Sequence, residues 1–204
     1  MSWSHGVSVV RYVMGVLLVV SLPPALLYWF IVHPFIGFWR RVGARRTFWF
    51  LGVFYAVTMA ALFPVRDRLM GRDLGTNPLA ISLAVPLVVA SGWVSRRRRR
   101  QLKFATLAGL PELAPEQQGP GLLTAGIYGR IRHPRYVEFG LGCLGWVLFA
   151  NYSGLYVLLA LSYAAIFAIV LLEERELRAR FGQSYVDYSL RVPRFIPRFE
   201  SRRR

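Results

Sequence analysis

Long uncharged apolar runs alternate with short basic segments along this chain. A helix rises about 1.5 Å per residue, so about 20 residues cross a hydrocarbon core of about 30 Å. The last run contains a single acid, Glu138, and a turn-like Asn-Tyr-Ser-Gly sequence at 151–154 divides it into two arms. The pattern predicts an all-α membrane protein with about five transmembrane helices, the last two forming a helical hairpin. The runs cover residues 13–32, 47–63, 79–95 and 137–172.

The segments outside these runs predict a structured loop and an amphipathic helix. Residues 101–135 are rich in glycine and proline, which indicates a long loop. Beyond residue 172, apolar residues recur every fourth position up to Tyr185, which predicts a C-terminal amphipathic cytosolic helix ending near Leu190. We expect a single membrane domain over residues 1–204: three spans in 1–100, then the loop, hairpin, helix and tail in 101–204.

The hairpin also contains small residues at close spacing. Three glycines on its first arm and two alanines on its second predict close approach of the two backbones. These residues are Gly140, Gly142, Gly145, Ala164 and Ala168.

Basic residues are distributed unequally between the two sides of the predicted membrane. The chain has 26 basic and 10 acidic residues. When segments are assigned alternately to the two sides, one side receives 22 basic residues and the other receives 4. Since lysine and arginine favour cytoplasmic loops, we expect the N-terminus outside and the C-terminus in the cytosol. The run Arg96–Arg100 then fits a topology anchor that binds anionic headgroups better than a nucleic-acid site.

Candidate chemistry falls at the two ends of the hairpin. Arg132-His133-Pro134-Arg135-Tyr136 precedes its first arm, and Glu173-Glu174 follows its second. Because a hairpin brings its ends together, these groups should be neighbours. Together they offer a guanidinium for a carboxylate, acids for an ammonium or hydroxyls, and aromatic rings for a base or cation. S-adenosyl-L-methionine has all of these counterparts: a carboxylate, an ammonium, ribose hydroxyls, and an adenine base beside a sulfonium cation. A nicotinamide nucleotide would need a phosphate cradle, and the chain has no G-x-G-x-x-G motif.

The C-terminal 75 or so residues closely resemble the isoprenylcysteine carboxyl methyltransferase family. The pattern is G-x-Y-x-x-I-R-H-P-x-Y, an apolar hairpin, E-E-x-x-L, F-G-x-x-Y-x-x-Y and V-P-x-x-I-P. Phospholipid N-methyltransferases look similar, and membrane sterol reductases share a looser version. The matching residues are Gly126, Tyr128, Ile131, Arg132, His133, Pro134, Tyr136, Glu173, Glu174, Leu177, Phe181, Gly182, Tyr185, Tyr188, Val192, Pro193, Ile196 and Pro197.

The resemblance implies a membrane-embedded methyltransferase with a cofactor pocket and a lipid-like or lipidated acceptor that arrives from the bilayer. It implies that Arg132 and Arg191 position the reacting groups. The cofactor-binding candidates are Gly126, Tyr128, Arg132, His133, Pro134, Tyr136, Glu173 and Glu174.

Three further acceptor-side candidates are less closely tied to the motifs. The family often has glycine at the position of Glu138, which is an acid at the membrane edge here and therefore a catalytic candidate or a partner of Arg135. Tyr185 and Tyr188 are candidates for substrate binding or for packing. His5, His33 and Cys143 have no metal-ligand spacing, so we predict no metal site.

Three other functions remain open at this point. The favoured function is methylation of a membrane-associated acceptor at the cytosolic face, with a phosphatidylethanolamine-type N-methyltransferase as the first alternative. An NADPH-dependent membrane reductase and a non-catalytic membrane scaffold are the alternatives from other classes. A carboxylate acceptor is already ionised at pH 7 and needs orientation and exclusion of water. An amine or thiol acceptor would need a base.

Overall fold

The computed structural model describes residues 3–101 and 121–198, and most of the predicted 101–135 loop lies outside them. No strand is formed in these two ranges. The α-helices are α1 (Trp3–Val32), α2 (Ile36–Val42), α3 (Ala44–Leu62), α4 (Arg66–Met70), α5 (Pro78–Arg99), α8 (Pro134–Ala150), α9 (Ser153–Phe181) and α10 (Gln183–Arg191). Short 3-10 helices are η1 (His33–Phe35), η2 (Phe63–Val65) and η3 (Gly126–Gly129).

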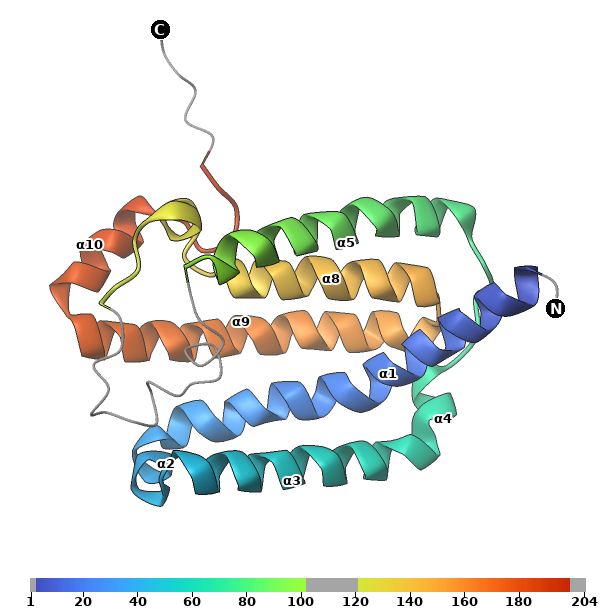
Figure 1. Ribbon diagram of the computed structural model, residues 1–204, viewed down its shortest axis with the longest axis horizontal. Helices are drawn as coiled ribbons and strands as arrows, with labels where there is room; N and C mark the ends of the chain where they lie inside the picture. Colours follow the sequence, from blue (N-terminus) through green and yellow to red (C-terminus); the bar gives the residue numbers. More distant parts are fainter. Residues whose placement is uncertain (1–2, 102–120, 199–204) are drawn as a thin grey trace, which may run out of the picture.

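The long helices lie side by side, with α1 next to α3, α9 next to α1 and α8, and α5 against α8 (Figure 1). The connection from α1 to α3, the C-terminal end of α5 and the helix α10 lie at one end of this bundle (Figure 1). The start of α1 and the turn between α8 and α9 lie at the opposite end. The three segments with the most basic residues therefore share one end.

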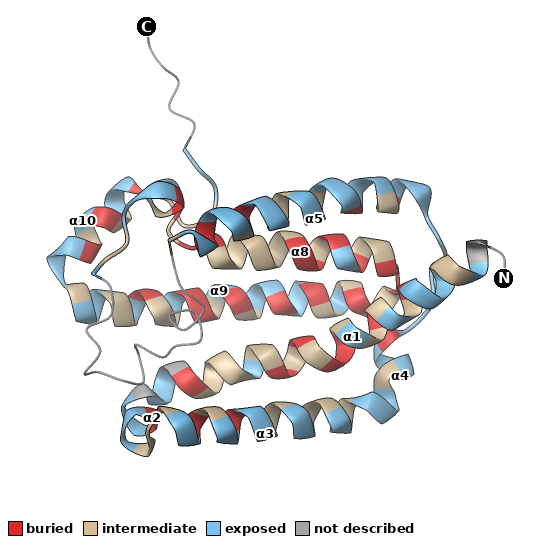
Figure 2. Cartoon of the chain, in the orientation of Figure 1, coloured by how far each residue is buried: buried red, intermediate tan, exposed pale blue. Residues whose placement is uncertain are grey.

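Four helical segments in the described ranges are long and apolar enough to cross a bilayer: His5–Val32, Ala44–Met70, Pro78–Arg99 and Ser153–Phe181. The shorter helix α8 has 17 residues and lies between α5 and α9. Large apolar side chains such as Trp49, Val57 and Val89 are exposed on the outer helices, which are mostly pale blue in Figure 2. Exposed apolar surface of this extent marks contact with lipid. The chain is an all-helical integral membrane protein.

The glycines of α8 pack mainly against α5, which corrects part of the prediction for the hairpin. A Cβ built on Gly145 would lie 2.7 Å from Val88 and 3.1 Å from the carbonyl oxygen of Ala84. One built on Gly142 would lie 3.0 Å from Ser91 Oγ. Only Gly140 faces α9, where Tyr163 lies 3.2 Å from the built position. The close approach predicted between the two hairpin arms is therefore found at Gly140, and the prediction is wrong for Gly142 and Gly145, which pack against α5.

The polar helix after the hairpin differs from the prediction in where it begins and breaks. Helix α9 continues without interruption from the apolar run to Phe181, so Glu173 and Glu174 lie within it. Gly182 then adopts φ +54°, a conformation that glycine adopts readily and other residues rarely do, and α10 begins at Gln183. Tyr185, Tyr188 and Val192 form a small buried cluster on α10. The amphipathic helix is therefore two segments joined at Gly182.

The end of the bundle opposite α10 is held by a buried arginine. Arg11 is 2% exposed, and its Nε donates to the Ala150 carbonyl at 3.1 Å. Its Nη2 also forms an ion pair with Asp73, in the connection between α4 and α5. Asn151 ends α8 in the left-handed conformation with φ 57°. Arg11 therefore fixes the predicted turn between the two arms against α1.

Candidate active site

The entrance to α8 is formed by a short 3-10 helix and a proline. Pro134 occupies the first helical position, where its missing N–H costs no hydrogen bond, and His133 directly precedes it. The helix η3 packs onto the end of α5 through Ile127, Ile131 and Val94. This packing fixes the chain segment from which Arg132 and His133 project.

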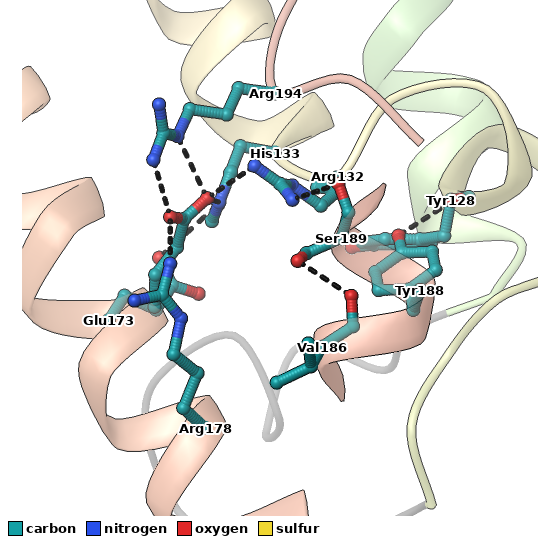
Figure 3. A network of polar contacts seen from close by, with 10 residues as sticks. Tyr128, Arg132, His133, Glu173, Arg178, Val186, Tyr188, Ser189 and Arg194 are labelled. Carbon is teal, nitrogen blue, oxygen red and sulfur yellow. Dashed lines mark hydrogen bonds and ion pairs between the residues drawn. The ribbon is translucent and has the colours of Figure 1, made fainter. Parts of the chain in front are cut away.

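Glu174 lies at the centre of a buried cluster of basic side chains, hereafter the Glu174 cluster (Glu174, Arg132, His133 and Arg194; Figure 3). The Glu174 side chain is 2% exposed, and Arg132 Nη2 lies 2.9 Å from its Oε1. His133 Nε2 lies 3.2 Å from the same oxygen. Arg194 donates to both carboxylate oxygens, at 3.0 Å and 2.8 Å. The predicted proximity of Arg132 and His133 to the glutamate pair is confirmed.

Arg194 is a member of this cluster that the sequence analysis missed. It falls at an unspecified position of the V-P-x-x-I-P pattern, and the motif singled out the neighbouring Arg191 instead. The C-terminal tail reaches the cluster because Arg132 N donates to the Pro193 carbonyl at 2.9 Å and His133 N donates to the Arg194 carbonyl at 3.1 Å. The hydrogen bond to Glu174 raises the pKa of Arg194. The sequence offered one signal for this role, because Arg194 is a basic residue directly after Pro193, where the chain leaves the last helix.

Buried polar atoms without a hydrogen-bond partner gather around the Glu174 cluster. Within the described ranges, Arg132 Nε, Glu173 Oε2 and Tyr185 OH are buried and have no such partner. They come from three different elements: the segment before α8, then α9, then α10. Leaving a buried polar group unsatisfied costs about 1–3 kcal/mol. Three such atoms close to one cluster make it a candidate ligand site.

The tyrosines of α10 connect the cluster to the segment before α8. Tyr188 OH donates to the Tyr128 carbonyl at 2.7 Å, and the rings of Tyr185 and Tyr188 meet edge-on at 6.0 Å. Burial raises the pKa of both Tyr185 and Tyr188 to about 12, and burial also raises the pKa of Tyr128. These phenols are therefore neutral at physiological pH and are able to donate hydrogen bonds.

Two predicted cofactor-binding residues occupy conformations that fit a role at the entrance. Gly126 has φ +59°, a conformation that favours glycine, and a Cβ there would displace the side chain of Gln101. The ring of Tyr136 lies 5.9 Å from that of His133.

Arg191 and Glu138, the predicted catalytic residues outside the Glu174 cluster, contact other groups. Arg191 is exposed at the end of α10, where its Nε donates to the Asp187 carbonyl at 3.3 Å. Glu138 pairs with Arg98 of α5, whose Nε lies 2.7 Å away. The ion pair considered for Glu138 in the sequence was with Arg135, whereas Arg135 stacks on Trp29, 4.3 Å from its ring centroid. One arginine of the 96–100 run is thus a buried partner of Glu138.

The long apolar helices and the polar cluster at one end of the bundle describe a membrane protein with a candidate active site. A family model described as phospholipid methyltransferase matches residues 79–184, more than half of the chain. The chain belongs to the phospholipid methyltransferase family. The matched region begins in α5 and includes α8, α9 and the Arg132–Glu174 pair.

Curated relatives match the chain over parts of their length. Methanethiol S-methyltransferase 2 of Bradyrhizobium diazoefficiens is 36% identical over 96 residues, which is 44% of this chain and 34% of that protein. A nickel-cobalt-cadmium resistance protein of Alcaligenes xylosoxydans xylosoxydans is 35% identical over 77 residues, 38% of this chain and 36% of that protein. A Delta(14)-sterol reductase of Mus musculus is 34% identical over 105 residues, 48% of this chain and 24% of that protein.

The chain thus spans between about a quarter and just over a third of the length of these relatives. No solved structure matches it.

Proposed function

We propose that this protein transfers a methyl group from S-adenosylmethionine to a membrane-associated acceptor, and that the cofactor binds beside the Glu174 cluster. The observation that carries the proposal is the set of buried unpartnered atoms on Arg132, Glu173 and Tyr185. A guanidinium N–H matches the cofactor carboxylate, and a carboxylate oxygen matches its ammonium or ribose hydroxyls. S-adenosylmethionine, when bound, supplies an electrophilic methyl group on its sulfonium.

The two glutamates have different roles in this proposal. Glu174 is already bonded to Arg132, His133 and Arg194, so its carboxylate holds the basic side chains in position. The Glu173 side chain is 31% exposed and lies 3.7 Å from His133 Nδ1 without hydrogen-bonding it. We assign Glu173 to cofactor contact and Glu174 to positioning. Tyr128, His133, Pro134 and Tyr136 are assigned to the wall of the same site, and Gly126 to the turn that leads into it.

The acceptor is held on the outer side of α10. Arg191 is exposed there, and within the described ranges it donates only to a backbone carbonyl, so its guanidinium is available to an acceptor carboxylate. An isoprenylcysteine-type carboxylate needs this orientation and no base. Tyr185 and Tyr188 lie on the same helix as Arg191, and Tyr185 contributes a hydroxyl to the pocket.

A phospholipid amine is the second candidate acceptor, favoured by the family to which the chain belongs. An amine must lose a proton before it attacks the methyl group. Glu138 is the candidate base for that reaction, and its ion pair with Arg98 would have to open first. The named activity of the Bradyrhizobium diazoefficiens relative adds a thiol to the possible acceptor classes.

The proposed orientation places the N-terminus outside and the C-terminus with the Glu174 cluster in the cytosol, where S-adenosylmethionine is available. It is supported by the ratio of 22 to 4 basic residues and by the position of the basic segments at one end of the bundle.

A calorimetric titration of S-adenosylhomocysteine into purified variants tests the proposed site. We expect Glu173→Gln to weaken binding about tenfold or more, because a charge-assisted hydrogen bond is worth about 1.5–3 kcal/mol. Glu174→Gln should lower the melting temperature, since removing one partner of a buried ion pair costs about 3–5 kcal/mol. Asp187→Asn, on exposed α10 surface, is the charge-matched control. Unchanged affinity in Glu173→Gln would place the cofactor elsewhere.

The same titration on Arg191→Lys separates the acceptor from the cofactor. We expect nearly unchanged S-adenosylhomocysteine affinity and a lower rate in a methyl-transfer assay, because lysine lacks the planar guanidinium fork. If the affinity for S-adenosylhomocysteine fell as much as the methyl-transfer rate, Arg191 would belong to the cofactor site.

A further inference from the structure

A separate basic pocket lies where the C-terminal end of α5 meets η3. Its volume is about 240 Å³, and it is lined by Trp93, Arg97, Arg100, Gln101, Gly126, Ile127 and Arg130. Four of these residues, at positions 93, 97, 100 and 101, recur at helical spacing and so share one face of α5 and its end. Arg130 directly follows η3. The pocket is therefore built by two elements whose packing is fixed by Ile127 and Val94.

The charge in this pocket is uncompensated. It contains three guanidinium groups and no acidic side chain in its lining. Over the described ranges, Arg97, Arg100 and Arg130 form no ion pair, whereas their neighbour Arg98 is paired with Glu138. The three groups are exposed at the surface. Three cations around one hollow repel each other unless an anion enters, so the pocket is matched to a ligand of negative charge.

The location of the pocket identifies the source of that anion. Helix α5 is one of the four candidate spans, and Arg97 lies in its last turn with Arg100 directly after it. Trp93, one turn earlier, is 52% exposed, as is typical of a residue at the membrane–water interface. The pocket consequently lies at the level of the lipid headgroups. A headgroup phosphodiester is the anion present there at high local concentration, and guanidinium groups bind phosphate oxygens in pairs.

We propose that this pocket binds the phosphate of an anionic phospholipid, which is distinct from the methyl acceptor. A zwitterionic headgroup fits less well, because its ammonium would find no acid in the lining and the Trp93 ring is already covered by Arg97, at 5.2 Å from the ring centroid. S-adenosylmethionine fits poorly for the same reason, since its sulfonium and ammonium would face three guanidinium groups.

The lipid site borders the Glu174 cluster along the chain. Arg130 lines the pocket, and Arg132, two residues later, contacts Glu174. Gly126 and Ile127 line the pocket as well, and the Tyr128 carbonyl next to them accepts from Tyr188. A bound headgroup thus holds in place the segment that carries Arg132. The binding itself does not depend on the proposed methyl transfer.

Lipid titration of the full chain in neutral detergent tests this proposal. Dioleoylphosphatidylglycerol is compared with dioleoylphosphatidylcholine and with inorganic phosphate, using melting temperature and native mass spectrometry as readouts. We expect phosphatidylglycerol alone to stabilise the protein and to be retained as a bound lipid. Equal stabilisation by phosphatidylcholine would overturn the anionic preference, and equal stabilisation by inorganic phosphate would assign the site to a free anion.

The matched pair of variants is Arg97→Gln/Arg100→Gln against Arg96→Gln/Arg99→Gln. Both remove two charges from the C-terminal end of α5, but only the first pair lines the pocket. We expect the first variant to bind phosphatidylglycerol about tenfold more weakly than the second, as for loss of a charge-assisted hydrogen bond. Arg130→Gln, on the other element, should also weaken binding. Equal losses in the two double variants would show diffuse attraction to the membrane surface and overturn the site.

Discussion

Glu174 illustrates how one buried carboxylate organises residues that are far apart in the chain. Arg132, His133 and Arg194 converge on it from the segment before α8 and from the tail (Figure 3). Desolvating a carboxylate costs several kcal/mol unless several partners compensate for the lost water. Glu174 has those partners within the protein, while Glu173 has a buried oxygen without one. We therefore propose different tasks for these two neighbouring glutamates.

Replacing Tyr185 with phenylalanine separates a ligand-binding hydroxyl from a structural one. The Tyr185 hydroxyl is buried without a partner in the described ranges, so its removal should leave the melting temperature unchanged or slightly higher. If the hydroxyl contacts the cofactor, S-adenosylhomocysteine affinity should fall between about twofold and tenfold. Thermal unfolding and calorimetry on the same preparation measure both quantities.

Tyr188→Phe is the control for that change. Its hydroxyl donates to the Tyr128 carbonyl at 2.7 Å, so its loss should destabilise the protein by about 1 kcal/mol. If Tyr185→Phe were the more destabilising of the two and left the affinity unchanged, its hydroxyl would have a structural role.

At the scale of elements, the apolar runs were sufficient to predict the long helices. The run at 79–95 became α5, and the turn predicted at 151–154 is confirmed by the break between α8 and α9. The partner of α8 was not predictable in the same way. Glycines show that a helix is closely approached but not by which neighbour, and the loop between α5 and α8 gave no restraint on their pairing. The break between α9 and α10 at Gly182 was not predicted either, because it depends on the positive φ of that glycine.

Gly145→Ala tests the packing of α8 against α5. The new Cβ would lie 2.7 Å from Val88 Cγ2 and 3.1 Å from a backbone oxygen, and neither atom moves easily. Overpacking of this kind costs about 1–3 kcal/mol, so the melting temperature should fall. The control is Gly92→Ala in α5, where no atom lies within 4 Å of the built Cβ. A Gly145→Ala protein as stable as the Gly92→Ala protein would show that the two helices pack less closely.

The candidate site was predictable from sequence only in part. That Arg132 and His133 meet the glutamate pair followed from the hairpin alone, because an even number of antiparallel arms returns the chain to its starting side. The participation of Arg194 did not follow, since it depends on the backbone bonds that draw Pro193 and Arg194 alongside residues 132–133. Nor did the pairing of Arg98 with Glu138, because five consecutive arginines look alike until a helix face is chosen.

At the scale of the whole molecule, the distribution of charge predicts the orientation in the membrane. In a Cys143→Ala background, cysteines introduced at Ser4 and Ser201 report the two sides. An impermeant thiol reagent applied to intact cells should label the Ser4 site, and the Ser201 site should react only after permeabilisation. The reverse pattern would contradict the proposed orientation and would separate the Glu174 cluster from cytosolic cofactor.

The central claim is that the end of the bundle containing Glu174 binds S-adenosylmethionine. Its most direct test is the melting temperature of the purified protein in detergent with S-adenosylmethionine, S-adenosylhomocysteine or NADPH. A ligand present at about 100 times its dissociation constant stabilises a folded protein by about 2.7 kcal/mol. We predict that the first two ligands raise the melting temperature and that NADPH does not. Stabilisation by NADPH alone would contradict the account.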